Sequence, residues 1–205
     1  MPAAPLLVAA FPPELAGLDG APPPGWRVAT VGVGAVAAAA GTARLIAAER
    51  PDRVLFVGTC GAYDGRLAVG DLLLASTVLA TSQDELSGRA HRPGIEVVRW
   101  DATWAVPLAL PAHAVAVPPA ITTAVEGVRA LASVAAAEHL EASGVFAACH
   151  VAGVPVAAAL AVANRVGPDA SAEWRANHAR VSRALVEALG PVLTTSAPAA
   201  RPRRW

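Results

Sequence analysis

The sequence predicts an α/β fold in which a central mixed or mostly parallel sheet carries helices on both faces. Short apolar runs that are typical of buried strands alternate with Ala-rich, Pro-free segments that are typical of helices. The chain has 205 residues, of which 55% are hydrophobic, so it can bury the core of one domain. We therefore expect one α/β domain over residues 1–195, followed by a flexible Pro/Ala/Arg tail at 196–205.

The first half of the chain predicts four strands and one helix. Strands are expected at residues 6–10, 27–31, 53–57 and 72–76, and the helix at Ala35–Glu49, which Pro51 and Asp52 terminate. The segment Gly58-Thr59-Cys60-Gly61 is expected to form a glycine-bracketed turn at the carboxyl end of the third strand.

The second half begins with a polar segment at residues 82–104, which is expected to be a surface excursion. A strand follows at 114–117, then an Ala-rich helix at 127–149 with a possible break at 138–141, a buried strand at 155–162 that ends at Asn164, and an amphipathic helix at 174–189. The uncharged stretch 142–163 is long enough for a membrane span. Because it contains His150 and the break Gly153-Val154-Pro155, we interpret it as a buried helix, a turn and a buried strand.

Charge and composition exclude several classes of function. Sixteen basic residues balance sixteen acidic ones, which argues against nucleic-acid binding. All the basic residues are Arg, which excludes a Lys nucleophile, a Schiff base and a P-loop. Charged residues make up only 16%, so we expect part of the surface to be covered by a second subunit in a homodimer.

The cysteines and the start of the chain predict a location. Cys60 and Cys149 are too few for a disulfide scaffold and suit buried thiols in a reducing cytoplasm. The amino-terminal segment MPAAPLLVAAFPPEL lacks the basic residues of a secretory signal. We therefore expect a cytoplasmic protein with no membrane partner.

Polar groups gather where the predicted strands end, and ligands bind at that edge of open α/β sheets. Glu14 follows the first strand, Gly32-Val33-Gly34 the second and Asn164 the last. Glu14 could equally be an exposed acid at a helix start, and the glycines could simply serve strand-to-helix packing. Glu141 lies in an apolar window, where a carboxylate must be partnered or functional.

Other reactive residue types carry less information. His139 and His150 are expected to be surface or capped histidines rather than ligands. The spacing of His, Cys and Asp predicts no metal site. Ser143-Gly144 lacks the context of a nucleophile elbow.

Taken together, the motifs resemble those of the nucleoside phosphorylase and nucleosidase superfamily, in its order and near its spacing. The resemblance spans residues 6 to 190, with a shortened middle, and is strongest to the futalosine hydrolase branch, followed by methylthioadenosine/S-adenosylhomocysteine nucleosidase. It implies a single-domain, three-layer phosphorylase-like fold. The motifs are Ala9-Ala10-Phe11-Pro12-Pro13-Glu14-Leu15, Gly32-Val33-Gly34, Pro51-Asp52 with Val57-Gly58-Thr59-Cys60-Gly61, Val69-Gly70-Asp71, Glu138-His139-Leu140-Glu141-Ala142 and Val162-Ala163-Asn164-Arg165-Val166-Gly167.

The resemblance also implies roles for individual residues. Glu14 would match the carboxylate that activates the attacking water, Glu141 the acid that binds the ribose hydroxyls, and Asn164 the residue that addresses N7 and the 6-position of a purine. The remaining matches would line the substrate: Thr59, Cys60 and Gly61 at the floor, and Leu140 against the sugar. No cofactor or metal is implied.

These roles imply hydrolysis of the N-glycosidic bond of a purine nucleoside, which in the futalosine branch belongs to menaquinone biosynthesis. An Asn amide suits a 6-oxopurine because it can donate to O6 and accept from N1–H. Phosphorolytic relatives carry an Arg where this chain has Phe56, and without it phosphate loses its main partner. Leu160, Ala163 and His139 depart from the nucleosidase pattern. The Leu160 and Ala163 departures weaken the water site, so a slow or specialised enzyme, or a binding paralogue without activity, remains an alternative. A nucleoside phosphorylase is the third. The sequence leaves the 5′-substituent open.

Overall fold

The fold is organised around two neighbouring strands, β1 (Leu6–Ala9) and β3 (Val54–Ala62), whose apolar side chains alternate between the two faces of a sheet. The computed structural model describes residues 3–94 and 98–194; the expected tail at 196–205 lies outside them. Leu6, Val8 and Phe56 pack into one core, while Leu7 and Leu55 pack into another on the opposite face. Two-sided burial explains why these strands are continuous apolar runs.

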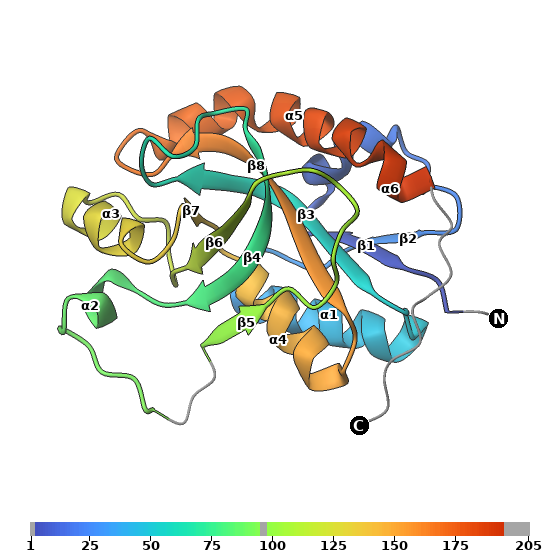
Figure 1. The fold of residues 1–205 in the computed structure, drawn as a ribbon, viewed down its shortest axis with the longest axis horizontal. Helices are drawn as coiled ribbons and strands as arrows, with labels where there is room; N and C mark the ends of the chain where they lie inside the picture. Colours follow the sequence, from blue (N-terminus) through green and yellow to red (C-terminus); the bar gives the residue numbers. More distant parts are fainter. Residues whose placement is uncertain (1–2, 95–97, 195–205) are drawn as a thin grey trace.

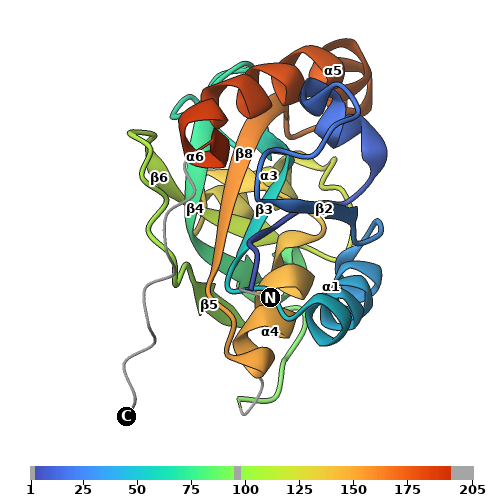
Figure 2. The ribbon, with the colours of Figure 1, turned by 90° about the vertical axis from the view of Figure 1, so that its right-hand side faces the viewer.

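Each face is covered by helices, as Figures 1 and 2 show. Helices α1 (Ala35–Glu49) and α4 (Ala142–Ala152) pack against each other on one face. Helix α5 (Ala170–Ala188) covers the other face together with the short 3₁₀ helix η1 (Pro12–Leu18). The predicted three-layer α/β architecture with a central mixed sheet is therefore confirmed.

Strand pairing closes part of the sheet into a ring. β3 pairs in parallel with β8 (Val156–Arg165), which pairs antiparallel with β4 (Leu72–Ala80). β4 pairs with β6 (Ala112–Val117), β6 with the two-residue β7 (Ala137–Glu138), and β7 returns to β3. β1 extends this ring outward to β2 (Arg27–Thr30), and β5 (Arg99–Asp101) pairs with β4. The carboxyl ends of β1, β3 and β8 consequently lie at one edge.

The remaining helices are short. They are α2 (Gln83–Leu86), α3 (Val125–Ala132) and α6 (Gly190–Thr194). Within the described part of the chain, no helix combines the length and the apolar character that crossing a membrane requires.

The glycine-bracketed turn expected at residues 58–61 is wrong, because β3 runs through this segment to Ala62. The glycines are needed instead because other side chains approach the backbone closely. A Cβ on Gly58 would lie 2.9 Å from His139 Nε2, and one on Gly61 would lie 2.8 Å from Asn164 Nδ2. Glycine within a strand often marks such a close approach.

The single helix expected at residues 127–149 is also wrong. The segment forms α3, β7 and α4, and the predicted break at 138–141 falls where the chain passes from β7 to α4. The Ala-rich stretch around Ala137 has high helix propensity, but its backbone is captured by β3 and β6, and this tertiary pairing overrides propensity.

The prediction for the uncharged stretch at 142–163 is confirmed. Helix α4 ends at Gly153, whose φ of 65° lies in the left-handed region that favours glycine, and β8 begins at Val156. Residues 82–104 include helix α2 and the strand β5, which pairs with β4; residues 95–97, between these two elements, lie outside the described residues.

Candidate active site

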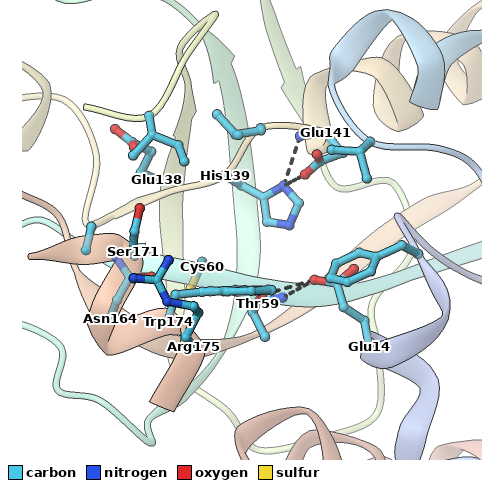
Figure 3. Close-up of a pocket in the computed structure, with 16 residues that line it drawn as sticks. Glu14, Thr59, Cys60, Glu138, His139, Glu141, Asn164, Ser171, Trp174 and Arg175 are labelled. Carbon is cyan, nitrogen blue, oxygen red and sulfur yellow. Dashed lines mark hydrogen bonds and ion pairs between the residues drawn. The ribbon is translucent and has the colours of Figure 1, made fainter. Parts of the chain in front are cut away.

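A cavity of about 440 Å³ opens at the edge of the sheet where β1, β3 and β8 end (Figure 3). All seven residues singled out from the sequence line it, although they come from four separate stretches of the chain. They are Glu14, Thr59, Cys60, Gly61, Leu140, Glu141 and Asn164. The structure thus brings the predicted residues to one place.

Glu14 lies in η1, immediately after β1, and is 3% exposed. The expectation of an exposed acid at a helix start is therefore wrong. Its Oε1 accepts hydrogen bonds from the backbone N–H and the hydroxyl of Thr59, at 2.8 and 3.1 Å, and its Oε2 accepts one from the backbone N–H of Ala10 at 3.1 Å. Burial raises the pKa of Glu14 to about 7, against the lowering effect of these donors.

Thr59 connects this carboxylate to α5. The indole N–H of Trp174 donates to Thr59 Oγ1 at 3.0 Å, so the hydroxyl proton is left for Glu14. The Trp174 ring lies 6.1 Å from that of Phe11 and stacks on His178 at 4.2 Å. The neighbouring thiol of Cys60 is buried, which raises its pKa, so it is an uncharged part of the cavity floor.

Glu141 occupies the N-cap position of α4, where its side chain makes no capping hydrogen bond, and is 7% exposed. Its Oε1 accepts a hydrogen bond from the backbone N–H of Gly34 at 2.7 Å, where α1 begins. The glycine turn before α1 therefore contributes directly to the site. The other oxygen, Oε2, lies 3.1 Å from Nδ1 of His139.

Asn164 lies in β8 against the backbone of Gly61. Its Nδ2 donates to the carbonyl oxygen of Arg165 at 2.9 Å, which fixes one N–H of the amide. Among the described residues the amide makes no other hydrogen bond. One N–H and the carbonyl oxygen are therefore available to a ligand.

The expectation that His139 is a surface or capped histidine is wrong, because its side chain lines the cavity and the residue is 3% exposed. Burial lowers its pKa, against the opposing effect of Glu141. The side chain of Phe56, which is fully buried, meets the ring edge-on at 5.1 Å. His150, in contrast, is exposed on α4, as predicted.

Glu138, adjacent to His139, belongs to one of the motifs, but the resemblance implies no role for it. It is buried and accepts hydrogen bonds from the Tyr63 hydroxyl at 2.9 Å and from the Thr122 backbone N–H at 3.0 Å. These contacts tie the loop before α3 to the cavity wall. Sequence reasoning also missed most of the outer wall, formed by Phe11, Val33, Ile121, Ala170, Ser171, Trp174 and Arg175.

The wall residues carry little local signal because they are apolar or lie on the amphipathic helix α5. Their selection depends on how α5 and η1 pack over the sheet edge. As for metals, the described residues contain no group of three or more His, Cys, Asp or Glu side chains placed to hold an ion.

Several solved structures share this architecture. A futalosine hydrolase mutant of Helicobacter pylori is 20% identical, with a TM-score of 0.79 over 91% of this chain and 96% of that one. A methylthioadenosine/S-adenosylhomocysteine nucleosidase of Helicobacter pylori, solved with butyl-thio-DADMe-Immucillin-A, is 18% identical, with a TM-score of 0.82 over 94% and 99%. The corresponding nucleosidase of S. pneumoniae, solved with the transition-state inhibitor MT-ImmA, is 16% identical, with a TM-score of 0.79 over 94% and 99%.

Likeness at this level of identity establishes the fold. A sequence model of the Phosphorylase superfamily matches residues 26–140, which is more than half of the chain. That stretch includes β3 with Thr59, Cys60 and Gly61, together with His139 and Leu140. On this match, the chain belongs to the Phosphorylase superfamily.

Proposed function

We propose that this protein hydrolyses the N-glycosidic bond of a purine nucleoside, as futalosine hydrolase and methylthioadenosine/S-adenosylhomocysteine nucleosidase do. One observation carries the proposal: two buried carboxylates, Glu14 and Glu141, line the same cavity as an Asn amide with free hydrogen-bonding capacity. The arrangement supplies groups for the water, the sugar and the base of one substrate.

Glu14 acts as the general base. A group whose pKa is about 7 is partly ionised at neutral pH and is well matched to accepting a proton from water. As the bond between C1′ and the purine nitrogen breaks, the water oxygen bonds to C1′ and Glu14 receives the proton. The purine leaves with the bonding electron pair and takes up a proton from solvent, and Glu14 afterwards returns its proton to solvent.

Glu141 and Leu140 hold the sugar, and Asn164 holds the base. Glu141 Oε2 accepts hydrogen bonds from ribose hydroxyls while Gly34 fixes Oε1. The amide of Asn164 donates to an oxygen or nitrogen of the purine edge, where negative charge develops in the transition state. Because that amide both donates and accepts, we propose a 6-oxopurine, in a substrate related to futalosine.

Hydrolysis is favoured over phosphorolysis by the buried surroundings of the water site. The Phe56 ring packs behind His139, and Arg175, on the outer wall, is the one arginine among the described residues that line the cavity. A phosphate dianion near Glu14 would therefore face a carboxylate without a compensating guanidinium, and desolvation without such a partner is costly.

The test is release of purine base from inosine, futalosine and methylthioadenosine, with and without phosphate. We expect base release without phosphate, and faster from futalosine or inosine than from methylthioadenosine. Strict dependence on phosphate would assign a phosphorylase instead. Saturable binding without release would assign a nucleoside-binding protein without catalytic activity.

A further inference from the structure

His139 has a buried polar atom that the contacts described above leave without a partner. Its side chain is 1% exposed, and Nε2 has no hydrogen-bond partner among the described residues. A buried N–H or lone pair without a partner is costly, so such an atom calls for a ligand or a bound water.

The position of Nε2 is defined by Gly58. A Cβ at Gly58 would lie 2.9 Å from His139 Nε2 and 3.1 Å from Glu14 Oε1, so both atoms face the same small space above this glycine. Figure 3 shows the free ring nitrogen directed toward the side of the cavity where Glu14 lies. The two atoms make no direct hydrogen bond with each other.

The other ring nitrogen determines what Nε2 offers. The backbone N–H of Glu141 donates to Nδ1 at 3.0 Å, although Glu141 Oε2 also lies 3.1 Å from Nδ1. The amide hydrogen is fixed by the peptide plane, whereas a carboxylate oxygen can turn toward a substrate hydroxyl. We therefore assign Nδ1 as the acceptor, which in a neutral ring places the proton on Nε2.

We propose that His139 holds the attacking water through Nε2–H, on the side opposite Glu14. This assignment rests on the proposed hydrolysis. The water oxygen accepts a hydrogen bond from Nε2–H and donates one to the carboxylate of Glu14. A second lone pair is then left for C1′, so one hydrogen bond orients the nucleophile while the other removes its proton.

Two substitutions separate the two ring nitrogens. In His139→Gln, the amide N–H at the end of the side chain reaches the region that Nε2 occupies in the histidine. In His139→Asn, the shorter side chain places its amide only in the region of Nδ1. The Asn variant retains an acceptor for the Glu141 backbone N–H but cannot reach the water. His150→Asn, on the exposed side of α4, is the matched control.

The experiment measures kcat and KM for base release from futalosine and inosine without phosphate, together with the product ratio in water–methanol mixtures. We expect His139→Asn to lower kcat by about 10²-fold with little change in KM, because a misplaced nucleophile slows the chemical step. His139→Gln should retain most of the activity, and His150→Asn all of it. The ratio of methyl glycoside to free sugar should change only in His139→Asn.

Each contrary outcome has a distinct meaning. Wild-type kcat in His139→Asn would overturn the assignment of His139 alone, since the protein would still hydrolyse nucleosides. A raised KM with unchanged kcat would overturn it too, by placing the side chain against the sugar. If the wild-type protein releases no base without phosphate, the proposed function fails, and the water assignment fails with it.

Discussion

Glu14 is held by three hydrogen bonds while being almost completely buried, and these two influences act on its pKa in opposite directions. Burial is the larger effect and raises the pKa to about 7, while the donors from Thr59 and Ala10 moderate it. A carboxylate with free access to water would have a much lower pKa and would be a weaker base. The pocket therefore tunes this residue for proton transfer near neutral pH.

Because the base must be ionised, kcat/KM should rise with pH up to about 7 and then level off. Glu14→Gln should lower kcat by about 10²–10⁴-fold.

Thr59→Val removes the hydroxyl donor to Glu14 but keeps the backbone N–H donor. The pKa of Glu14 should therefore increase, and the rising limb of the pH profile should move to higher pH. The measurement is the pH profile of kcat/KM for the three proteins. A limb that stays in place in Thr59→Val would contradict the assignment of Glu14 as the titrating base.

Asn164 is expected to select the base. One amide N–H donates to the carbonyl oxygen of Arg165. In Asn164→Asp, a carboxyl oxygen would face that carbonyl, which favours the protonated acid. Its remaining oxygen would accept from a 6-amino group, so preference should move from 6-oxopurine toward 6-aminopurine nucleosides by roughly 5–150-fold, the equivalent of one unpaired buried group at about 1–3 kcal/mol.

The measurement is the ratio of kcat/KM for inosine and adenosine derivatives that carry the same 5′-group. Asn177→Asp serves as a control, because Asn177 makes a similar amide-to-carbonyl hydrogen bond to Glu173 on α5, outside the cavity. An unchanged ratio in Asn164→Asp, or a wild-type protein that prefers the adenine member, would show that Asn164 does not read the base.

At the level of elements, the site depends on how closely α1 and α4 approach each other. A Cβ at Gly144 would lie 2.0 Å from the carbonyl oxygen of Ala35. This proximity brings the first turn of α1 beside the start of α4, so that Gly34 N–H can reach Glu141. The glycine in α4 is therefore a requirement of helix packing, and the carboxylate depends on it.

Gly144→Ala should destabilise the protein, although alanine is intrinsically the better helix former by about 0.5–1 kcal/mol. The added methyl group would collide with backbone atoms, and overpacking of this kind typically costs about 1–3 kcal/mol. The measurement is the free energy of unfolding in denaturant. Gly65→Ala, where an added Cβ meets nothing within 4 Å, should leave stability nearly unchanged. Equal stability of the two variants would contradict the packing argument.

Sequence patterns predicted elements best where local and tertiary preferences agree. The apolar runs of β1 and β8 and the Ala-rich helix α1 satisfy both, so they were assigned correctly. Two elements differ from the prediction because residues distant in the sequence determine them. Residues 58–62 are strand because their backbone pairs with β8 and, at Gly61 and Ala62, with β7. β7 is strand because its backbone pairs with β3 and β6.

The same reasoning explains what was predicted of the site. Glu14, the Thr59 segment and Asn164 follow from the rule that strands end at a common edge, and Glu141 follows from the cost of a carboxylate in an apolar window. His139 could not be found this way. Its burial arises only after the segment between β7 and α4 is folded against Phe56 and Gly58. The outer wall likewise depends on the packing of α5 and η1.

For the molecule as a whole, the ring of five strands places chemically distinct groups around one cavity at the edge of the sheet. β3 is shared by the two sides of that ring, since it pairs with both β8 and β7. Through these pairings, the base-binding Asn164 and the segment that carries His139, Leu140 and Glu141 are held on either side of Thr59. This is the geometry that we propose positions a nucleoside between a water and a base-reading amide.

The most direct test of the central claim is the identity of the sugar produced from futalosine or inosine in excess phosphate. If a water activated by Glu14 is the nucleophile, as we propose, free base and free reducing sugar should form in equal amounts, at a rate that phosphate does not change. Both products should be lost together in Glu14→Gln. Formation of a sugar 1-phosphate, or binding of the nucleoside without release of base, would contradict the account.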